Sequence, residues 1–185
     1  MILKNTLLAV LLFTATFLVG QQQNDGHFLV EFDAFTPPTQ DLITSFEGHS
    51  AEQFLANDVT GVEHYLGDYK GKKVILWFWS IESTKAKEQM SAMTLLQERN
   101  SDLKLIAFVK EPKAQVLDYL RASPVDFSVI PNGEVFGEMA YGAELGRPRM
   151  FLIDQQGMIK VVLPEEAFVD NTNLLVSLES ILGGF

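Results

Sequence analysis

Two unbroken apolar runs stand out along the chain, at residues 74–79 and 105–109. Neither run alternates apolar with polar positions, which is typical of strands covered on both faces in the centre of a sheet. Between them, apolar residues recur at helical spacing over 84–98, and a second helical segment follows at 113–121. Strand, helix, strand and helix in this order predict a parallel strand pair joined by a crossover helix.

The C-terminal third of the chain predicts an antiparallel strand pair and a closing helix. Apolar segments at 150–153 and 158–163 flank a short turn in which Gly157 supplies a left-handed backbone position. Leucines at helical spacing over 173–182 predict the last helix. The whole pattern therefore predicts an α/β fold with a central mixed β-sheet, parallel in its first half and antiparallel in its second, and helices on both faces.

The N-terminal residues 1–20 have the pattern of an export signal. One positive charge, Lys4, precedes an apolar stretch from Leu7 to Val19. At about 1.5 Å per residue this stretch is too short to cross the roughly 30 Å of hydrocarbon in a bilayer. We therefore predict a signal peptide or an uncleaved N-terminal anchor. The protein is expected in the periplasm or cell envelope, or secreted, and to touch membrane only through this segment.

Residues 21–50 differ from the rest of the chain because they are polar and lack a sustained period. We interpret them as a leader arm with at most one short strand, near residues 27–32. The folded domain is then expected to span residues 51–185.

Composition excludes several kinds of chemistry. The chain has 24 acidic residues against 14 basic ones, a formal net charge of -10 and no cysteine. The negative charge opposes binding to nucleic acid. The absence of cysteine excludes disulfides, thiolate nucleophiles and thiolate-bound metals. His27, His49 and His64 are far apart in the sequence, so we expect solvated imidazoles and no metal site.

Two separated motifs resemble one protein family. Residues 68–79 read DYKGKKVILWFW, and residues 141–142 read YG and precede GRPRMFLIDQQGMI at 146–159. Both motifs resemble those of the exported TlpA/ResA-like thiol-disulfide oxidoreductases, which are also grouped with the AhpC/TSA redoxins. The resemblance covers about residues 62–162 and implies a thioredoxin-like three-layer sandwich.

The resemblance also implies a degenerate active site. The family's C-x-x-C positions fall on Ser83, Thr84, Lys85 and Ala86. Both catalytic cysteines are therefore replaced. The family's acidic residue falls on Gln89, which cannot titrate. No base is evident beside Ser83 to activate its hydroxyl, so we expect this serine to cap a helix. We predict no catalytic residue and no cofactor, although the family is enzymatic.

Shape is expected to persist where the thiols are lost. The resemblance implies that Pro148 is a cis proline facing the degenerate turn, where family members pair with extended polypeptide. We therefore expect a groove formed by Ser83, Arg147 and Pro148 that binds an exported protein or peptide.

Three basic residues near this groove have a second interpretation. Lys85 and Lys87 lie in the first turn of the predicted helix and Arg147 directly precedes the proline, although a helix N-terminus disfavours cations. Such a group is compatible with a bound carboxylate or phosphate. The alternative is a solvated patch in which the lysines pair with Glu82 and Glu88.

Three functions follow from these observations. The first is a binding or assembly module without thiol chemistry of its own. The second is a family-type thiol-disulfide oxidoreductase, with a role in cell redox homeostasis, that acts through a partner or a bound thiol. The third is a small-anion-binding or structural accessory protein. The absence of cysteine favours the first and third.

Trp77 and Trp79 lie in an apolar run and are expected in the core rather than on a ligand.

Overall fold

A computed structural model describes residues 46–143, 146–165 and 171–185. In chain order the elements are β1 (Leu55–Asn57), β2 (Glu63–Tyr65), the 3-10 helix η2 (Leu66–Tyr69), β3 (Lys73–Trp79), α1 (Thr84–Arg99), β4 (Leu103–Val109), α2 (Lys113–Ala122), β5 (Ser128–Ile130), α3 (Glu134–Tyr141), β6 (Arg149–Ile153), β7 (Ile159–Leu163) and α4 (Asn171–Gly183). The predicted leader strand and the N-terminal segment lie outside the described residues. Among the described helices, none is long and apolar enough to cross a membrane.

The main sheet has the strand order β5-β4-β3-β6-β7, and β1 and β2 form a separate antiparallel hairpin. β3, β4 and β5 are parallel, whereas β6 and β7 are antiparallel to their neighbours. The predicted mixed sheet is therefore confirmed. The positive φ of Gly157, at 86°, confirms the left-handed turn position between β6 and β7.

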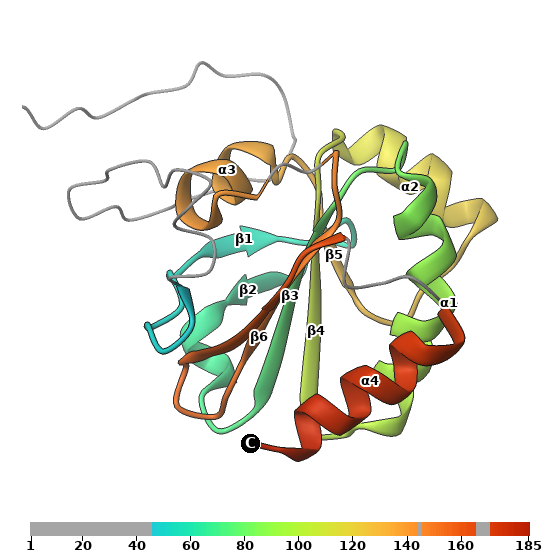
Figure 1. The fold of residues 1–185 in the computed structure, drawn as a ribbon. Helices are drawn as coiled ribbons and strands as arrows, with labels where there is room; N and C mark the ends of the chain where they lie inside the picture. The colour runs from blue at the N-terminus through green and yellow to red at the C-terminus, as the bar shows by residue number, and fades with distance from the viewer. Residues whose placement is uncertain (1–45, 144–145, 166–170) are drawn as a thin grey trace, which may run out of the picture.

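β3 is buried along both faces, as its unbroken apolar sequence predicts. Alternate side chains point to opposite faces of a strand, so the run contributes to two separate cores. One core packs against α1, α2 and α4, and the other against α3 and the β1–β2 hairpin (Figure 1). Trp77 and Trp79 are fully buried in the first core, which confirms the expectation for both tryptophans.

Several short elements were not predicted from the sequence. β1, β2 and β5 have three residues each, which is too short to show alternation. The eight-residue α3 contains Gly137, a weak helix former. Burial against β3 and β4 stabilises these elements, so tertiary packing outweighs their weak local preference.

Candidate functional site

The degenerate C-x-x-C positions lie where β3 passes into α1. Ser83 is the N-cap residue of α1, and its Oγ accepts a hydrogen bond from the Ala86 N–H at 3.2 Å. The prediction that Ser83 caps a helix is confirmed. Ser83 and Lys85 are half-buried, Thr84 is exposed, and Ala86 is fully buried. The arrangement therefore offers a hydroxyl committed to capping rather than a nucleophile.

A buried carboxylate holds the turn that precedes this helix. Glu111, at the end of β4, accepts hydrogen bonds from Ser80 Oγ at 2.5 Å and from the Ile81 N–H at 3.0 Å. Ser80 Oγ in turn accepts from the Glu82 N–H at 3.1 Å. Charge-assisted hydrogen bonds of this kind are stronger than neutral ones. The turn is therefore fixed to the neighbouring strand.

Neither Glu111 nor Ser80 was among the residues singled out from the sequence. A signal was available, because Glu111 follows the apolar run at 105–109 and precedes Pro112. An acidic side chain next to a buried strand needs a partner if it is buried as well. The sequence does not indicate that this partner is Ser80, which lies thirty-one positions earlier.

Gln89 lies on the buried face of α1, and its amide has no hydrogen-bond partner among the described residues. The side chain of Gln89 is 1% exposed, and among the described residues neither its Oε1 nor its Nε2 has a partner. The indole N–H groups of Trp77 and Trp79 also have no hydrogen-bond partner among the described residues. A buried amide without partners costs roughly 1 to 3 kcal/mol. The position that matches the family's acid is therefore occupied by a neutral amide, which we expect to destabilise the core.

The groove residue Pro148 differs from the expectation in its peptide geometry. The register pairs Phe78 with Arg149, and one further step along it places the buried Pro148 opposite Trp79. No peptide bond among the described residues is cis, so the expectation of a cis Pro148 is wrong. The trans form is the more stable one before proline by about 0.5 to 1 kcal/mol. The pairing of β6 with β3 forms with this peptide bond trans.

The basic residues near the turn pair with acids of the same chain. Lys85 Nζ lies 3.8 Å from Glu88 Oε2, and Arg147 Nε lies 3.4 Å from Glu165 Oε2. Lys87 is exposed on the outer face of α1. The lysine–glutamate pair agrees with the solvated patch. Binding of an anion by Lys85, Lys87 and Arg147 stays a prediction.

A second polar cluster links the β1–β2 hairpin to the 3-10 helix η2 that precedes β3. His64 is 4% exposed, so the expectation of a solvated imidazole is wrong for this residue. Its Nε2 lies 3.0 Å from Asp58 Oδ2 and its Nδ1 lies 2.5 Å from Tyr69 Oη. His49 is exposed as expected, and His27 lies outside the described residues. The described residues contain no group of side chains able to hold a metal ion.

Hydrogen bonding fixes the ionisation of Asp58. Burial alone would raise its pKa, but hydrogen bonds from His64, Thr60 and Val62 outweigh this effect and hold the pKa below its usual value. Burial, and less strongly the neighbouring Asp68, raise the pKa of Tyr69. A neutral Tyr69 hydroxyl can donate to the imidazole, which can donate to the Asp58 carboxylate. Each of the three side chains can therefore find a hydrogen-bond partner within this chain.

Curated proteins similar to this chain include several named thiol-disulfide oxidoreductase ResA. ResA of Geobacillus thermodenitrificans (strain NG80-2) is 31% identical over 120 residues, which cover 63% of this chain and 68% of that protein. ResA of Bacillus subtilis (strain 168) is 29% identical over 136 residues, which cover 70% and 75%. Because this chain has no cysteine, its similarity to these proteins does not imply that it has their thiols.

Solved structures show the same fold. The thioredoxin domain of a thiol-disulfide oxidoreductase from Bacteroides vulgatus superposes with a TM-score of 0.61 at 15% identity, covering 73% of this chain and 96% of that one. A secreted disulfide oxidoreductase of Mycobacterium tuberculosis gives a TM-score of 0.59 at 14% identity, covering 69% and 96%. The thioredoxin-like architecture predicted from the sequence is therefore confirmed.

The sequence model described as the AhpC/TSA family matches residues 47–162. This range includes the hairpin, the turn between β3 and α1, and the strand pair that follows Pro148. Together with the two motifs and the fold, the match shows that the chain is a redoxin that belongs to the AhpC/TSA family.

Proposed function

We propose that this redoxin is a binding module that performs no thiol chemistry of its own and holds an extended exported polypeptide at a groove formed by Ser83, Arg147 and Pro148. The single observation that carries the proposal is the fixed turn before α1. Glu111 and Ser83 both commit hydrogen bonds to this turn, although it carries no reactive atom. A surface that is already ordered loses little conformational entropy when a partner binds.

Arg147 is the recognition element in this proposal. Its guanidinium is about half exposed, and its pair with Glu165 is partly exposed too. Exposed ion pairs contribute at most about 1 kcal/mol, so a partner can replace Glu165 at low cost. Because Pro148 is trans, the proposal assigns recognition to the Arg147 side chain and not to backbone groups presented by a cis proline. A guanidinium can bind both a carboxylate and a backbone carbonyl.

Two other functions are each favoured by a different observation. The oxidoreductase function is favoured by the names of the curated relatives and requires a partner or a bound thiol. The anion-binding function is favoured by the basic group of Lys85, Lys87 and Arg147. Action outside the cytoplasm is part of the proposal and rests on the pattern of residues 1–20.

Photo-crosslinking tests the proposal. A photoreactive residue at the exposed Thr84, placed in the full chain in cell-envelope extracts, is expected to capture one specific polypeptide. Arg147→Glu is expected to abolish this capture. Arg121→Glu is the matched control, because Arg121 is also an exposed arginine paired with an acid, and it should retain capture. Equal capture by both variants would contradict the groove.

Turnover assays distinguish the enzymatic alternative. The purified protein is expected to reduce neither insulin nor glutathione disulfide, because no thiol is available to attack the disulfide. Turnover without added thiol would replace the binding proposal by the oxidoreductase function. Binding of phosphate or acetate that is lost in Arg147→Ala, without polypeptide capture, would favour the anion-binding function.

A further inference from the structure

A separate hollow of about 290 Å³ lies at the start of β3, at the opposite end of that strand from Ser83. Its floor is formed by Leu66, Val74 and Ile153, and polar side chains stand around it. Hollows of this kind, with an apolar floor and a few convergent polar groups, are where small molecules bind, and about 300 Å³ is the lower end of their usual size. The hollow shares no residue with the proposed groove.

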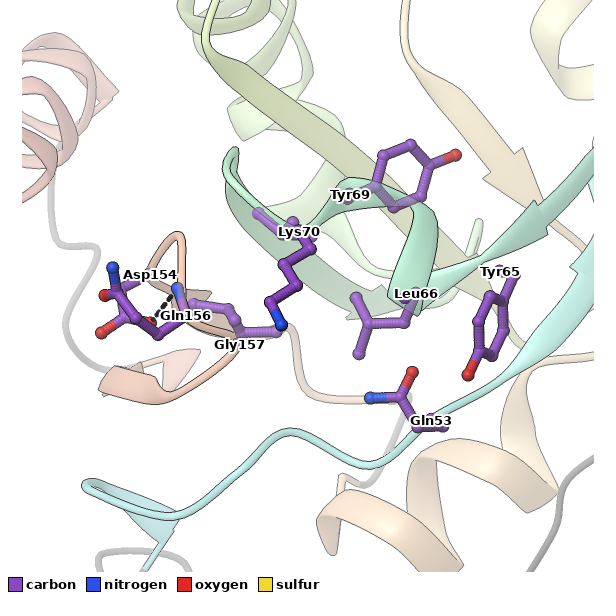
Figure 2. Close-up of a pocket in the computed structure, with 11 residues that line it drawn as sticks. Gln53, Tyr65, Leu66, Tyr69, Lys70, Asp154, Gln156 and Gly157 are labelled. Atoms are coloured by element: carbon purple, nitrogen blue, oxygen red, sulfur yellow. Dashed lines mark hydrogen bonds between the residues drawn. The ribbon is translucent and has the colours of Figure 1, made fainter.

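Two polar side chains face the floor of the hollow from opposite sides. Figure 2 shows the Lys70 side chain, which follows η2, extending into the space between Gly157 and Leu66, and the Gln53 amide approaching Leu66 from the segment before β1. Among the described residues, Gln53 Nε2 has a single hydrogen-bond partner, the Ala51 carbonyl at a long 3.4 Å. Both groups therefore retain hydrogen-bonding capacity for a ligand placed over Leu66.

The charge of Lys70 is unbalanced locally. Within the part of the chain that the structure describes, no carboxylate lies within ion-pair distance of its amine. Asp154 also lines the hollow, but its Oδ1 accepts from the backbone N–H groups of Gln156 and Met158, both at 2.9 Å. The Lys70 amine, which has no ion-pair partner among the described residues, is therefore a local positive charge that can attract an anionic ligand against the overall net charge of -10.

The ring of Tyr65 forms a wall of the hollow. This ring lies directly against Gly67, where a Cβ would come within 2.4 Å of Tyr65 Cε1. The absence of a side chain at position 67 therefore allows the ring to approach η2 this closely. Tyr65 is still 42% exposed, so part of this aromatic residue is available to contact a ligand.

We propose that this hollow binds a small organic anion with a flat apolar body. Its carboxylate contacts the Lys70 amine and the Gln53 amide, and its body lies between Leu66 and the Tyr65 ring. An amine gives charge selection, an amide adds a second hydrogen bond, and an aromatic wall selects flat molecules. The proposal concerns a different surface from the polypeptide groove and does not depend on it.

Benzoate and its neutral analogue benzamide test the proposal. Titration of the full chain, followed by NMR shifts of the Leu66 methyl groups, is expected to show benzoate binding about fivefold tighter than benzamide. In Lys70→Gln this preference should disappear. Lys72→Gln is the matched control, because it removes an exposed lysine two positions away that does not line the hollow, and it should keep the preference.

Tyr65→Ala tests the aromatic wall and should weaken the binding of both compounds by about threefold. Circular dichroism of each variant shows whether the fold is kept, and the change at Lys70 is at an exposed position. Equal binding of benzoate and benzamide would overturn the proposal. An equal loss of the preference for benzoate in Lys70→Gln and Lys72→Gln would overturn it too. The absence of any Leu66 shift at millimolar benzoate would overturn it as well.

Discussion

The two ends of β3 make a useful comparison. After its last residue, a carboxylate, a serine and a helix cap hold the turn that carries the family's thiols, although no thiol is present here. Before its first residue, a hydrogen-bonded chain of Asp58, His64 and Tyr69 joins the hairpin to the 3-10 helix η2. Both networks order backbone around β3. The comparison shows that the turn after β3 is held by hydrogen bonds although the chain has no cysteine, whereas the network before β3 joins a hairpin to a helix.

The largest expected effect comes from the network after β3. Glu111→Ala leaves Ser80 Oγ and the Ile81 N–H without their acceptor. Removing a charged acceptor from buried donors costs roughly 3 kcal/mol, so we expect a loss of about this size in the free energy of unfolding measured with urea. Glu111→Gln keeps one acceptor oxygen and should lose less. Equal stability of Glu111→Ala and the wild type would show that the turn is held by other contacts.

The network before β3 is expected to be pH-dependent. Because the folded-state pKa of Asp58 lies below its unfolded value, its carboxylate stabilises the fold above pH about 4. This contribution is lost as the pH falls through the folded-state pKa. Asp58→Asn should cost roughly 2 kcal/mol at pH 7.

The pH dependence supplies the control for this prediction. The stability difference between Asp58→Asn and the wild type should shrink as the pH is lowered below about 4. Asp118→Asn, which changes an exposed acid paired with Arg121, should show little effect at any pH. A difference for Asp58→Asn that is the same at pH 3 and pH 7 would show that its carboxylate charge is not what stabilises the hairpin.

A gain in stability is expected beneath α1. Gln89→Leu replaces a buried amide that has no partner among the described residues, so unfolding should require about 1 to 2 kcal/mol more free energy. Gln97→Leu on the same helix is the matched control. Gln97 donates to the Leu103 carbonyl at 2.9 Å and accepts from the Leu105 N–H at 2.7 Å, so this change should destabilise. Destabilisation by both changes would indicate that Gln89 has partners after all.

The smallest effect is expected at the groove. Arg147→Ala should change the free energy of unfolding by less than about 1 kcal/mol, because its pair with Glu165 is partly exposed. The same change should abolish polypeptide capture. A large loss of stability would make Arg147 a structural residue and remove it from the proposed binding surface.

Long elements with a clear period were predictable from the sequence. β3, β4 and α1 agree with the expected ranges within one or two residues, because each combines length with a strong apolar pattern. The family motifs located Ser83 at the start of the helix. The hairpin was missed because its strands gain stability from packing and have three residues each.

The errors have a common physical cause. The burial of His64 depends on Asp58 and Tyr69, which approach it only when the hairpin and η2 fold together. The isomer before Pro148 is set by its tertiary surroundings, because the two forms differ little in energy. Contacts made in three dimensions decide both features, and neither has a periodic signal along the chain.

Restoring the two thiols tests the central claim most directly. In Ser83→Cys/Ala86→Cys the first thiol would occupy a helix N-cap position, where backbone N–H groups and the helix dipole stabilise a thiolate. We expect the oxidised variant to contain one internal disulfide and the reduced variant to reduce insulin, an activity that we do not expect of the wild type. Two cysteines that stay unpaired under oxidising conditions, with no gain of activity, would contradict the claim that the family's redox scaffold is intact.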